Sequence, residues 1–321
     1  MRKPLLALSA LSLMLSIATA CAEPQPVTAA AEDLEVLQFE FPGILIGSAA
    51  FPDGPTGTTV FHFPDGVAAA SDIRGGSVGA TGAEFGFLNA LSFSGGSLFG
   101  LEVPSGIRAE LLERADNQVR WDTIPLVAGA IIWDFNQRKN AVYPNMQLGR
   151  AALRSAKAGR FVQGRAGAGI AAAVGQGAAY RQVGDLRIAV FTVVNALGRV
   201  VDRGGNTLTH DGVPAIEALE QKLESEGLTQ ALAPAPTIAE ATQHTTLTLV
   251  AINARDLRLE QIARQVHTSM ARAIQPFHTE FDGDILWAVT TNKIETSLNT
   301  TEVGLIASEV AWDAVLNAVT E

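Results

Sequence analysis

Cysteine is nearly absent from this chain of 321 residues, since Cys21 is the only one. One thiol cannot form a disulfide within the chain, so the fold has to be held together by its core. The composition allows this, because 47% of the residues are hydrophobic and 17% are charged, as in globular proteins with a substantial core. The length suits one large domain or two ordinary ones.

Basic residues are also few, with 23 Lys and Arg against 33 Asp and Glu and a formal net charge of −10. Binding to a phosphate backbone requires a basic face on the protein. Nucleic acid is therefore a poor candidate partner. The sequence also contains no long run of one charge sign that would suggest a charged tail.

Several common kinds of site lack their sequence signature. The histidines are scattered without the paired spacing of H-E-x-x-H, so no metal site is expected. Gly167 to Ala172 fits the loose dinucleotide pattern, but the strand before it is weak and Asp185 begins the next strand instead of ending it. No cofactor is expected.

Residues 1–20 predict a signal peptide, with a basic start, an apolar stretch from Leu5 to Ile17 and a small-residue cleavage site. The apolar stretch is too short to span a bilayer stably. Cys21 directly follows and resembles the lipidated cysteine of bacterial lipoproteins. Two outcomes are open: a lipid anchor at Cys21 on a bacterial membrane, or cleavage at a neighbouring alanine to give a soluble periplasmic protein. Removal of the signal peptide takes away two bases and no acid, so the net charge falls from −10 to −12.

Residues 21–36 are rich in Ala, Pro and acids and predict a flexible tether, after which a single domain spans 37–321. Up to about residue 107 this domain reads as short strands and glycine turns, whereas strands and helices alternate later. Such an order favours a layered α/β or α+β sandwich over a barrel. The later strands are expected at 125–135, 185–195, 246–252 and 285–291, and the helices at 148–157, 259–274 and 303–319. Residues 199–243 show the least regular pattern.

Two threonines, Thr245 and Thr246, begin a run that reads as a buried strand, TTLTLVAINA. On composition alone they are β-branched strand residues. A threonine hydroxyl is a weak nucleophile unless a base adjoins it, and one such base is the threonine's own α-amine at a chain N-terminus. That amine titrates near ~8 and is substantially neutral near physiological pH. Thr245 would carry such an amine only after a cut that follows His244.

Seven segments in one order resemble the L-aminopeptidase/D-esterase family of self-cleaving peptidases, which includes the β-aminopeptidases and the nylon-oligomer (6-aminohexanoate-oligomer) endohydrolases. The nylon-oligomer branch is the more similar, because it shares the threonine nucleophile and the F-D-G-D stretch. The segments are GILIG with GPTGTTV, SDIRGGSVGATGAE, LNALSFSGGSLFGLEVPSGI, PLVAGAIIWDF with YPNMQLGRAAL, VVNALG, HTTLTLVAINA and FDGDILWAVTT.

The resemblance implies a hydrolase of amide bonds that cleaves itself between His244 and Thr245 and then uses Thr245 as its nucleophile. It assigns Asn195 to the oxyanion and the paired acidic positions to Asp282 and Asp284. Period two along a strand would send both carboxylates to one face, where they would raise the pKa of one of them. One acid would then move a proton while the other orients the threonine.

Two positions depart from the family pattern. The lysine of the nylon-oligomer branch is replaced by Arg165, which keeps the charge but cannot give up its proton, so an electrostatic role is expected in place of a relay. The residue before the cut, commonly Asn or Gly, is His244, whose imidazole would assist or hinder self-cleavage. Tyr143 is assigned to substrate binding through its hydroxyl, with a tyrosine packed in a loop as the equal alternative.

For the whole protein the resemblance implies an α/β fold, a four-layer αββα sandwich of the N-terminal-nucleophile-hydrolase type. It also implies a homo-oligomer of processed chain pairs, typically four, acting on a small amide or peptide without cofactor or metal. The alternative is a cleavage-impaired relative that serves as a surface-tethered, non-catalytic binding lipoprotein. The reasons for this alternative are His244 and Arg165, which depart from the family pattern, and Cys21, which could carry a lipid anchor.

Overall fold

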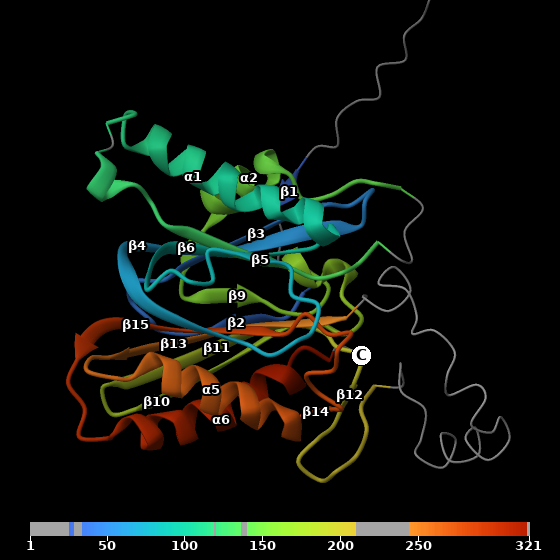
Figure 1. Cartoon of the computed structure of the whole chain (residues 1–321), viewed down its shortest axis with the longest axis vertical. Coiled ribbons are helices and arrows are strands. Elements are labelled where there is room, and N and C mark those ends of the chain that lie inside the picture. Colours follow the sequence, from blue (N-terminus) through green and yellow to red (C-terminus); the bar gives the residue numbers. More distant parts are fainter. Residues whose placement is uncertain (1–25, 29–33, 119, 136–139, 210–243, 320–321) are drawn as a thin grey trace, which may run out of the picture.

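The molecule has four layers, in the order helices, sheet, sheet, helices (Figure 1). The computed structural model describes residues 26–28, 34–118, 120–135, 140–209 and 244–319. Helices α1 (Val103–Arg114) and α2 (Met146–Ser155) cover the outer face of one sheet layer. Helices α5 (Leu259–Ser269) and α6 (Thr300–Leu316) cover the outer face of the other. The predicted αββα sandwich is confirmed.

The two sheet layers are one continuous hydrogen-bonded sheet, because the long strand β4 (Thr56–Ile73) belongs to both. Its first half pairs with β3 (Leu45–Phe51) and β6 (Phe87–Ser94), and its second half pairs with β15 (Ile285–Ile294). Between these halves the register with β6 shifts, and Gly66 has φ 70. Such an irregularity bends a strand, and β4 curves here from one layer into the next (Figure 1).

The second layer is built around β13 (Thr245–Ala254), and all of its residues are buried. On one side it pairs antiparallel with β11 (Leu186–Asn195), which pairs in turn with β10 (Gly175–Val183). On the other side it pairs parallel with β15. A strand covered on both faces needs apolar residues on both, which explains the nearly continuous run. The first layer is completed by β7 (Val127–Ile131) and β5 (Ala80–Thr81).

Short elements complete the described part. The strands are β1 (Val27–Thr28), β2 (Val36–Gln38), β8 (Lys157–Ala158), β9 (Arg160–Val162), β12 (Arg199–Val200) and β14 (Ile274–Gln275). The 3-10 turns are η1 (Ser97–Glu102), η2 (Trp121–Thr123), η3 (Gly167–Ala171) and η4 (Met270–Arg272). Within the range predicted as a tether, β1 pairs with β3. The predicted signal peptide, Cys21 and residues 210–243 lie outside the described residues.

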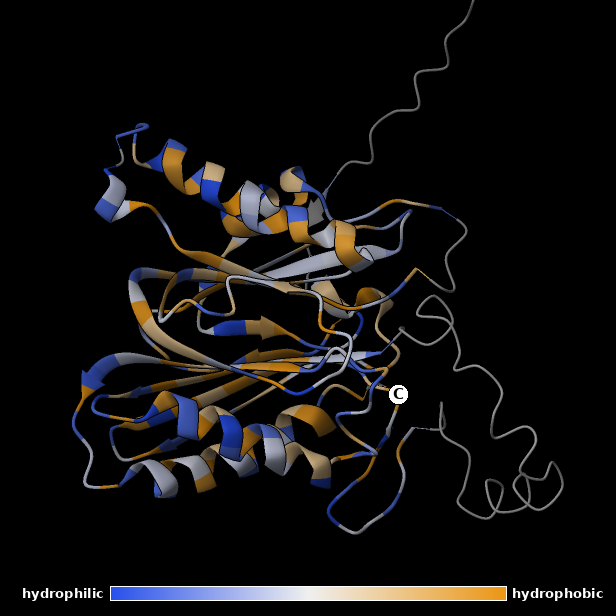
Figure 2. Ribbon diagram, viewed as in Figure 1, coloured by the Kyte–Doolittle hydropathy of each residue, from blue (hydrophilic) through white to orange (hydrophobic). Residues whose placement is uncertain are grey.

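Three apolar clusters fill the three spaces between the layers, and Figure 2 shows the apolar residues gathered there. The cluster between the sheets is rich in aromatic rings, with Phe61 against Phe93 at 5.2 Å and Phe93 against Trp287 at 6.2 Å between centroids. The outer clusters join each sheet to its two helices, as Val250 joins β13 to α5. Residues of β13 alternate between these spaces, so Leu247 faces the other sheet and Val250 faces the helices.

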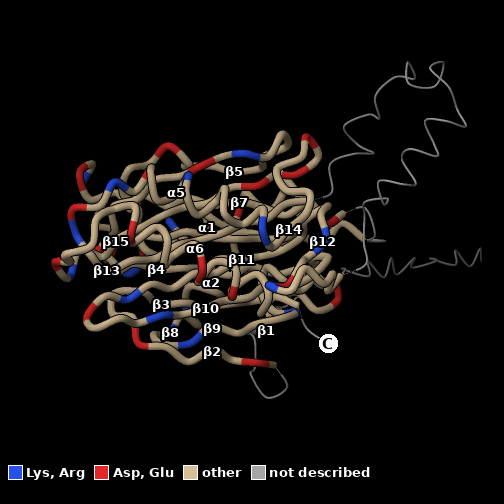
Figure 3. The backbone as a smooth tube through the Cα atoms, turned by 90° about the horizontal axis from the view of Figure 1, so that it is seen from below, with Lys and Arg blue, Asp and Glu red and all other residues tan. Residues whose placement is uncertain are grey.

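The surface carries charges of both signs. Lys and Arg are interspersed with Asp and Glu along the described backbone (Figure 3), and no basic face stands out there. In the described ranges, none of the helices combines the length and the apolar character that crossing a membrane requires.

The expected late strands and helices correspond to β7, β11, β13, β15, α2, α5 and α6. The expectation of short strands and glycine turns up to about residue 107 is wrong in two places. Residues from Val103 onward form helix α1, with proline in its first turn and Gly106 packed so closely on Met146 that a Cβ would lie 2.1 Å from that carbonyl oxygen. Strand β4 is long, because it continues through Pro64 to Ile73.

The core between the sheets gives a stability prediction. Replacing the fully buried Trp287 by Ala should lower the free energy of unfolding by about 3–5 kcal/mol, because a large cavity would remain between the sheets. Trp121 is 87% exposed, and Trp121→Ala should change the free energy of unfolding by less than about 0.5 kcal/mol. Equilibrium unfolding in denaturant measures both values. Equal losses for the two variants would contradict the placement of Trp287.

Candidate active site

Four of the predicted site residues meet where strands of the second layer end. Thr245 begins β13, and the antiparallel register sets Asn195, the last residue of β11, directly opposite it. Asp282 and Asp284 lie in the loop that leads into β15, and an isolated bridge pairs His244 with Asp282. By strand alternation Thr245 shares the face of β13 that looks toward the other sheet.

Thr245 has no exposed surface, and its hydroxyl donates a hydrogen bond to the carbonyl oxygen of His244. The backbone N–H of Gly283 donates to the same oxygen at 2.9 Å. Any Cβ on Gly283 would lie 2.9 Å from Thr245 Oγ1, so only glycine brings this amide so close without displacing the hydroxyl. The peptide bond between His244 and Thr245 is thus held between a hydroxyl and an N–H donor.

Asp284 is fully buried and binds three donors. Its Oδ1 accepts the backbone N–H of Thr246 at 2.7 Å. Its Oδ2 accepts the backbone N–H of His278 at 3.1 Å and lies 3.0 Å from Nδ1 of the same residue. Burial raises the pKa of Asp284, and the nearby charge of Asp282 raises it further, while the hydrogen bond from His278 lowers it. The pKa therefore stands above the usual range for aspartate.

Asp282 is also fully buried. Its Oδ1 accepts the N–H of Leu197 at 3.2 Å, and its Oδ2 accepts the N–H and the hydroxyl of Thr279. These contacts join the loop before β15 to the end of β11. The two acids were expected on a strand, but they precede β15 because Gly283, between them, turns its N–H to His244.

Asn195 uses both ends of its side-chain amide. Its Oδ1 accepts the N–H of Ala173 at 2.8 Å, and its Nδ2 donates to the carbonyl of Trp133 at 3.2 Å. Arg165 donates to the carbonyl of Ala172 and, at 3.0 Å, to that of Ala173. Arg165 therefore steadies the backbone segment that holds Asn195, and among the described residues its hydrogen bonds go to this segment and not to Thr245.

Tyr143 lies apart from these contacts, in the loop before α2. Its hydroxyl donates to Glu102 at 2.9 Å, and its ring lies 5.2 Å from that of Phe99. The hydrogen bond to Glu102 raises the pKa of Tyr143. The structure thus gives the tyrosine a partner of its own in the loop, which is the packed arrangement that the sequence left open.

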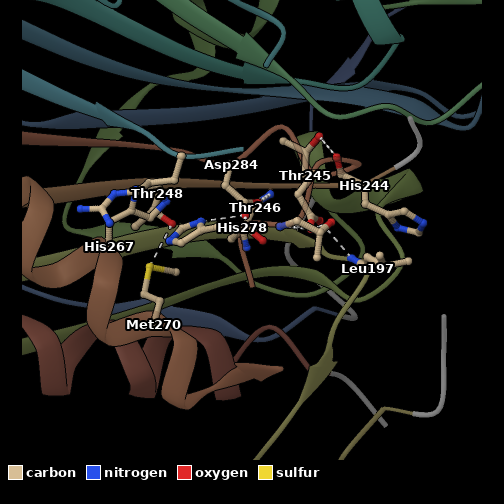
Figure 4. A network of polar contacts seen from close by, with 12 residues as sticks. Leu197, His244, Thr245, Thr246, Thr248, His267, Met270, His278 and Asp284 are labelled. Atoms are coloured by element: carbon tan, nitrogen blue, oxygen red, sulfur yellow. Dashed lines mark hydrogen bonds and ion pairs between the residues drawn. The ribbon is translucent and has the colours of Figure 1, made fainter. Parts of the chain in front are cut away.

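The imidazole of His244 lies on the far side of Thr245 from Asp284 (Figure 4). Burial lowers the pKa of His244, and the charge of Asp282 opposes this only in part. The ring is therefore uncharged at neutral pH. An uncharged ring places no positive charge beside the carbonyl of His244, so its polarisation comes from the two donors that bind it, the hydroxyl of Thr245 and the N–H of Gly283.

A glycine loop supports the two acids. The N–H groups of Arg74 and Gly75 donate to the carbonyl of Asp284, and that of Ser77 donates to the carbonyl of Asp282. A Cβ on Gly75 would lie 2.2 Å from the backbone N of Asp284. The sequence analysis recognised the run RGGSVG as a glycine turn and as part of one of the seven segments of the resemblance.

Two contributors were missed by the sequence reading. His278 lies six residues before Asp284 in the same run, PFHTEFDGD, and this closeness is the signal that could have found it. Gly283 stands inside the F-D-G-D stretch, where only the structure reveals the target of its N–H. Among the residues that the structure describes, no three His, Cys, Asp or Glu side chains gather as metal ligands do.

Comparison with known proteins gives one family. Residues 40–321 match the model of peptidase family S58. The chain is 42% identical over 310 residues to a 6-aminohexanoate-oligomer endohydrolase of Paenarthrobacter ureafaciens, covering 88% of this chain and 86% of that protein. It is also 42% identical over 309 residues to a putative NylC-analogous protein of Agromyces sp. (strain KY5R), covering 88% and 99%.

Solved structures agree on the fold. A β-aminopeptidase of Burkholderia sp. matches with a TM-score of 0.62 at 17% identity, over 88% of this chain and 87% of that one. The L-aminopeptidase D-Ala-esterase/amidase of Ochrobactrum anthropi, a variant of the Ntn hydrolase fold, matches with 0.60 at 15% identity, over 86% and 83%. The resemblance read from the seven segments is confirmed: this chain belongs to peptidase family S58.

Proposed function

We propose that this protein is a self-processing hydrolase that cuts its own chain between His244 and Thr245 and then hydrolyses amide bonds through Thr245. Family membership already makes it a peptide or amide hydrolase. The finer proposal is carried by one observation: the hydroxyl of Thr245 donates to the carbonyl of His244, at the peptide bond that would be cut.

In the proposed self-cleavage, Thr245 Oγ attacks the carbonyl carbon of His244. A bond from Oγ to carbon forms, the bond from carbon to the Thr245 nitrogen breaks, and the hydroxyl proton passes to that nitrogen. The N–H of Gly283, 2.9 Å from the carbonyl oxygen, would stabilise the negative charge of the intermediate. Water then hydrolyses the ester, which leaves a carboxylate on His244 and a free α-amine on Thr245.

In substrate turnover, the α-amine takes the hydroxyl proton while Thr245 Oγ attacks the substrate carbonyl. The amine product leaves with a proton, an acyl group stays on Thr245, and water releases it as the acid. Asn195 would supply a second N–H to the oxyanion once its Nδ2 turns from the carbonyl of Trp133. Asp284, through the N–H of Thr246, fixes the strand end that carries the nucleophile.

Three of the relatives at 42% identity are named 6-aminohexanoate-oligomer endohydrolases, so short linear polyamides are the first substrates to test. Peptides with a free amino end and β-amino amides suit the same chemistry. Export, a lipid anchor at Cys21 and assembly as several chain pairs stay predictions. Arg165 gives the non-catalytic alternative no support, because its guanidinium binds the backbone carbonyls of Ala172 and Ala173 and so steadies the segment that holds Asn195.

The first test compares two neighbouring threonines. The mature protein should separate under denaturing conditions into two chains, the smaller beginning at Thr245. Thr245→Val should remain one chain and lose amide hydrolysis by more than about a thousandfold. Thr246→Val should still be cut, because the buried hydroxyl of Thr246 has no hydrogen-bond partner among the described residues. Intact-mass spectrometry decides, and an uncut wild-type protein would overturn the proposal.

A second test concerns the glycine loop. Gly75→Ala should slow self-cleavage about a hundredfold, because the new Cβ would displace the backbone of Asp282 and Asp284 and misplace the carbonyl that Thr245 attacks. Gly86→Ala is the matched control, since a Cβ there meets nothing within 4 Å. The fraction of cut chain against time measures the effect. Equal rates in the two variants would show that the loop does not hold the acids.

A further inference from the structure

We propose that His278 is a positioning residue that holds the carboxyl group of Asp284, favours its charged form and thereby controls hydrolysis at Thr245. The inference rests on the proposed function, because Asp284 affects turnover only if Thr245 is the nucleophile. Neither the family motifs nor the sequence reading pointed to this histidine.

His278 holds Asp284 with two groups at once. Its backbone N–H donates to Oδ2 at 3.1 Å, and its ring Nδ1 lies 3.0 Å from the same oxygen. The residue has φ 62, in the left-handed region that is unfavourable for a residue other than glycine. Such backbone strain persists where surrounding contacts enforce it, and it is common at functional sites. In this structure the strained backbone occurs where the N–H and the ring of His278 both contact Oδ2 of Asp284.

The other oxygen of Asp284 leads to the nucleophile. It accepts the N–H of Thr246, the residue that follows Thr245. In Figure 4 the side chains follow one another from His267 through His278 and Asp284 to Thr246 and Thr245. Thr246 and Val250 lie on the face of β13 that looks toward α5, whereas Thr245 looks toward the other sheet. His278 therefore acts from the helix side, through the carboxylate.

A second histidine closes this arrangement on the side of α5. The ring of His267 meets that of His278 edge to face, 4.3 Å between centroids, and its Nδ1 lies 2.9 Å from Asp72. Burial lowers the pKa of His267 to about 4, so the ring is uncharged at neutral pH and donates its Nδ1–H to Asp72. His267 therefore packs against His278 as an uncharged ring, and its Nδ1–H is bound to Asp72 and not to Asp284.

The charged groups around the pair come from the loop before β15 and from the end of β4. Asp282 raises the pKa of Asp284 from the same loop. From the end of β4, Asp72 faces His267 and is paired with Arg74 at 2.8 Å. Burial alone would raise the pKa of Asp72, but its hydrogen bonds to His267 and Arg74 hold it below the usual range. Among the described residues, His278 is therefore the side chain in contact with Asp284 that can carry a positive charge.

The consequence follows from electrostatics. An ionised Asp284 stabilises the positive charge that the α-amine of Thr245 acquires when it takes the hydroxyl proton, and it accepts the N–H of Thr246 more strongly than a neutral acid does. Burial and Asp282 raise the pKa of Asp284, whereas His278 lowers it. Removing the ring takes away a lowering contribution, so the pKa rises and the ionised fraction at a given pH falls. The acid limb of activity should move to higher pH.

Two substitutions separate charge from simple hydrogen bonding. His278→Gly removes the ring, keeps the backbone N–H and suits φ 62. His278→Asn tolerates the same backbone and can donate a neutral hydrogen bond, but it cannot carry a charge. His62→Asn is the control, because His62 is buried in the other sheet layer with its Nδ1 against the carbonyl of Asn89. Thermal unfolding of every variant reports whether it folds.

The measurement is kcat/KM for amide hydrolysis against pH. For both His278→Gly and His278→Asn the acid limb of the profile should move to higher pH by about one pH unit. At a pH below the limb, kcat/KM should then be about tenfold lower than in the wild type, and at high pH it should recover to within about threefold of the wild-type value. His62→Asn should keep the wild-type profile. A wild-type profile for His278→Asn would reduce His278 to a structural hydrogen bond. A uniform loss without a shift would also overturn the inference.

A second readout does not depend on activity. In the uncut Thr245→Val protein, the carboxyl ¹³C signal of Asp284, assigned by its loss in Asp284→Asn, should titrate at higher pH when His278→Gly is added. If the wild-type chain is never cut but this shift occurs, the proposed function fails and the coupling of His278 to Asp284 stands. If the chain is cut and the signal does not shift, only the inference about His278 fails.

Discussion

The register of β13 between its two neighbours is the constraint on which the site depends. Antiparallel pairing with β11 sets Asn195 opposite Thr245, and parallel pairing with β15 brings the loop of Asp282 and Asp284 beside the same strand end. A slip of one residue would turn Thr245 to the helix side and Thr246 toward the other sheet. The alternation of Leu247 and Val250 between two apolar clusters prevents such a slip, so the core that stabilises the sandwich also aims the nucleophile.

Two buried carboxylates in one loop are costly unless donors surround them. The chain supplies most of these donors from its backbone, through the N–H groups of Leu197, Thr246, His278 and Thr279. Fixed amides hold a carboxylate without the entropy loss of long side chains. The glycine loop at 74–77 makes this possible, since it lies against the backbone of both acids. Its glycines are therefore part of the site although they have no side chain to offer.

Much of the later half of the fold could be predicted from the sequence. The unbroken apolar runs of β11, β13 and β15 indicated buried strands, and the spacing in α2, α5 and α6 indicated helices. Helix α1 was missed because residues up to about 107 were expected to form short strands and glycine turns, and Gly106 is explained only by its contact with Met146. The length of β4 was also missed, because only its pairing with β15 in the second layer shows that the chain continues as one strand.

For the site, the resemblance supplied Thr245, Asn195 and the two acids, and the structure gathers all four. Spacing alone could not supply the partners of these residues. The N–H of Gly283 reaches His244, a residue distant in the sequence, and the ring of His267 reaches His278 from another element. Arg165 and Tyr143 were placed by family pattern, yet the structure gives them contacts with Ala173 and Glu102. Contacts of this kind depend on packing, which local patterns do not encode.

The position of β13 and β15 inside the second layer has a topological consequence. A cut after His244 would place both strands in the C-terminal fragment, while β11 and β4, which flank them, would stay in the N-terminal fragment. The fragments would then be interleaved within one sheet, and separating them would open four strand edges at once. Their association would also change from a folding step within one chain to an encounter of two molecules, which depends on concentration. A processed molecule that unfolds would therefore refold poorly, and its lifetime would be set by its rate of unfolding.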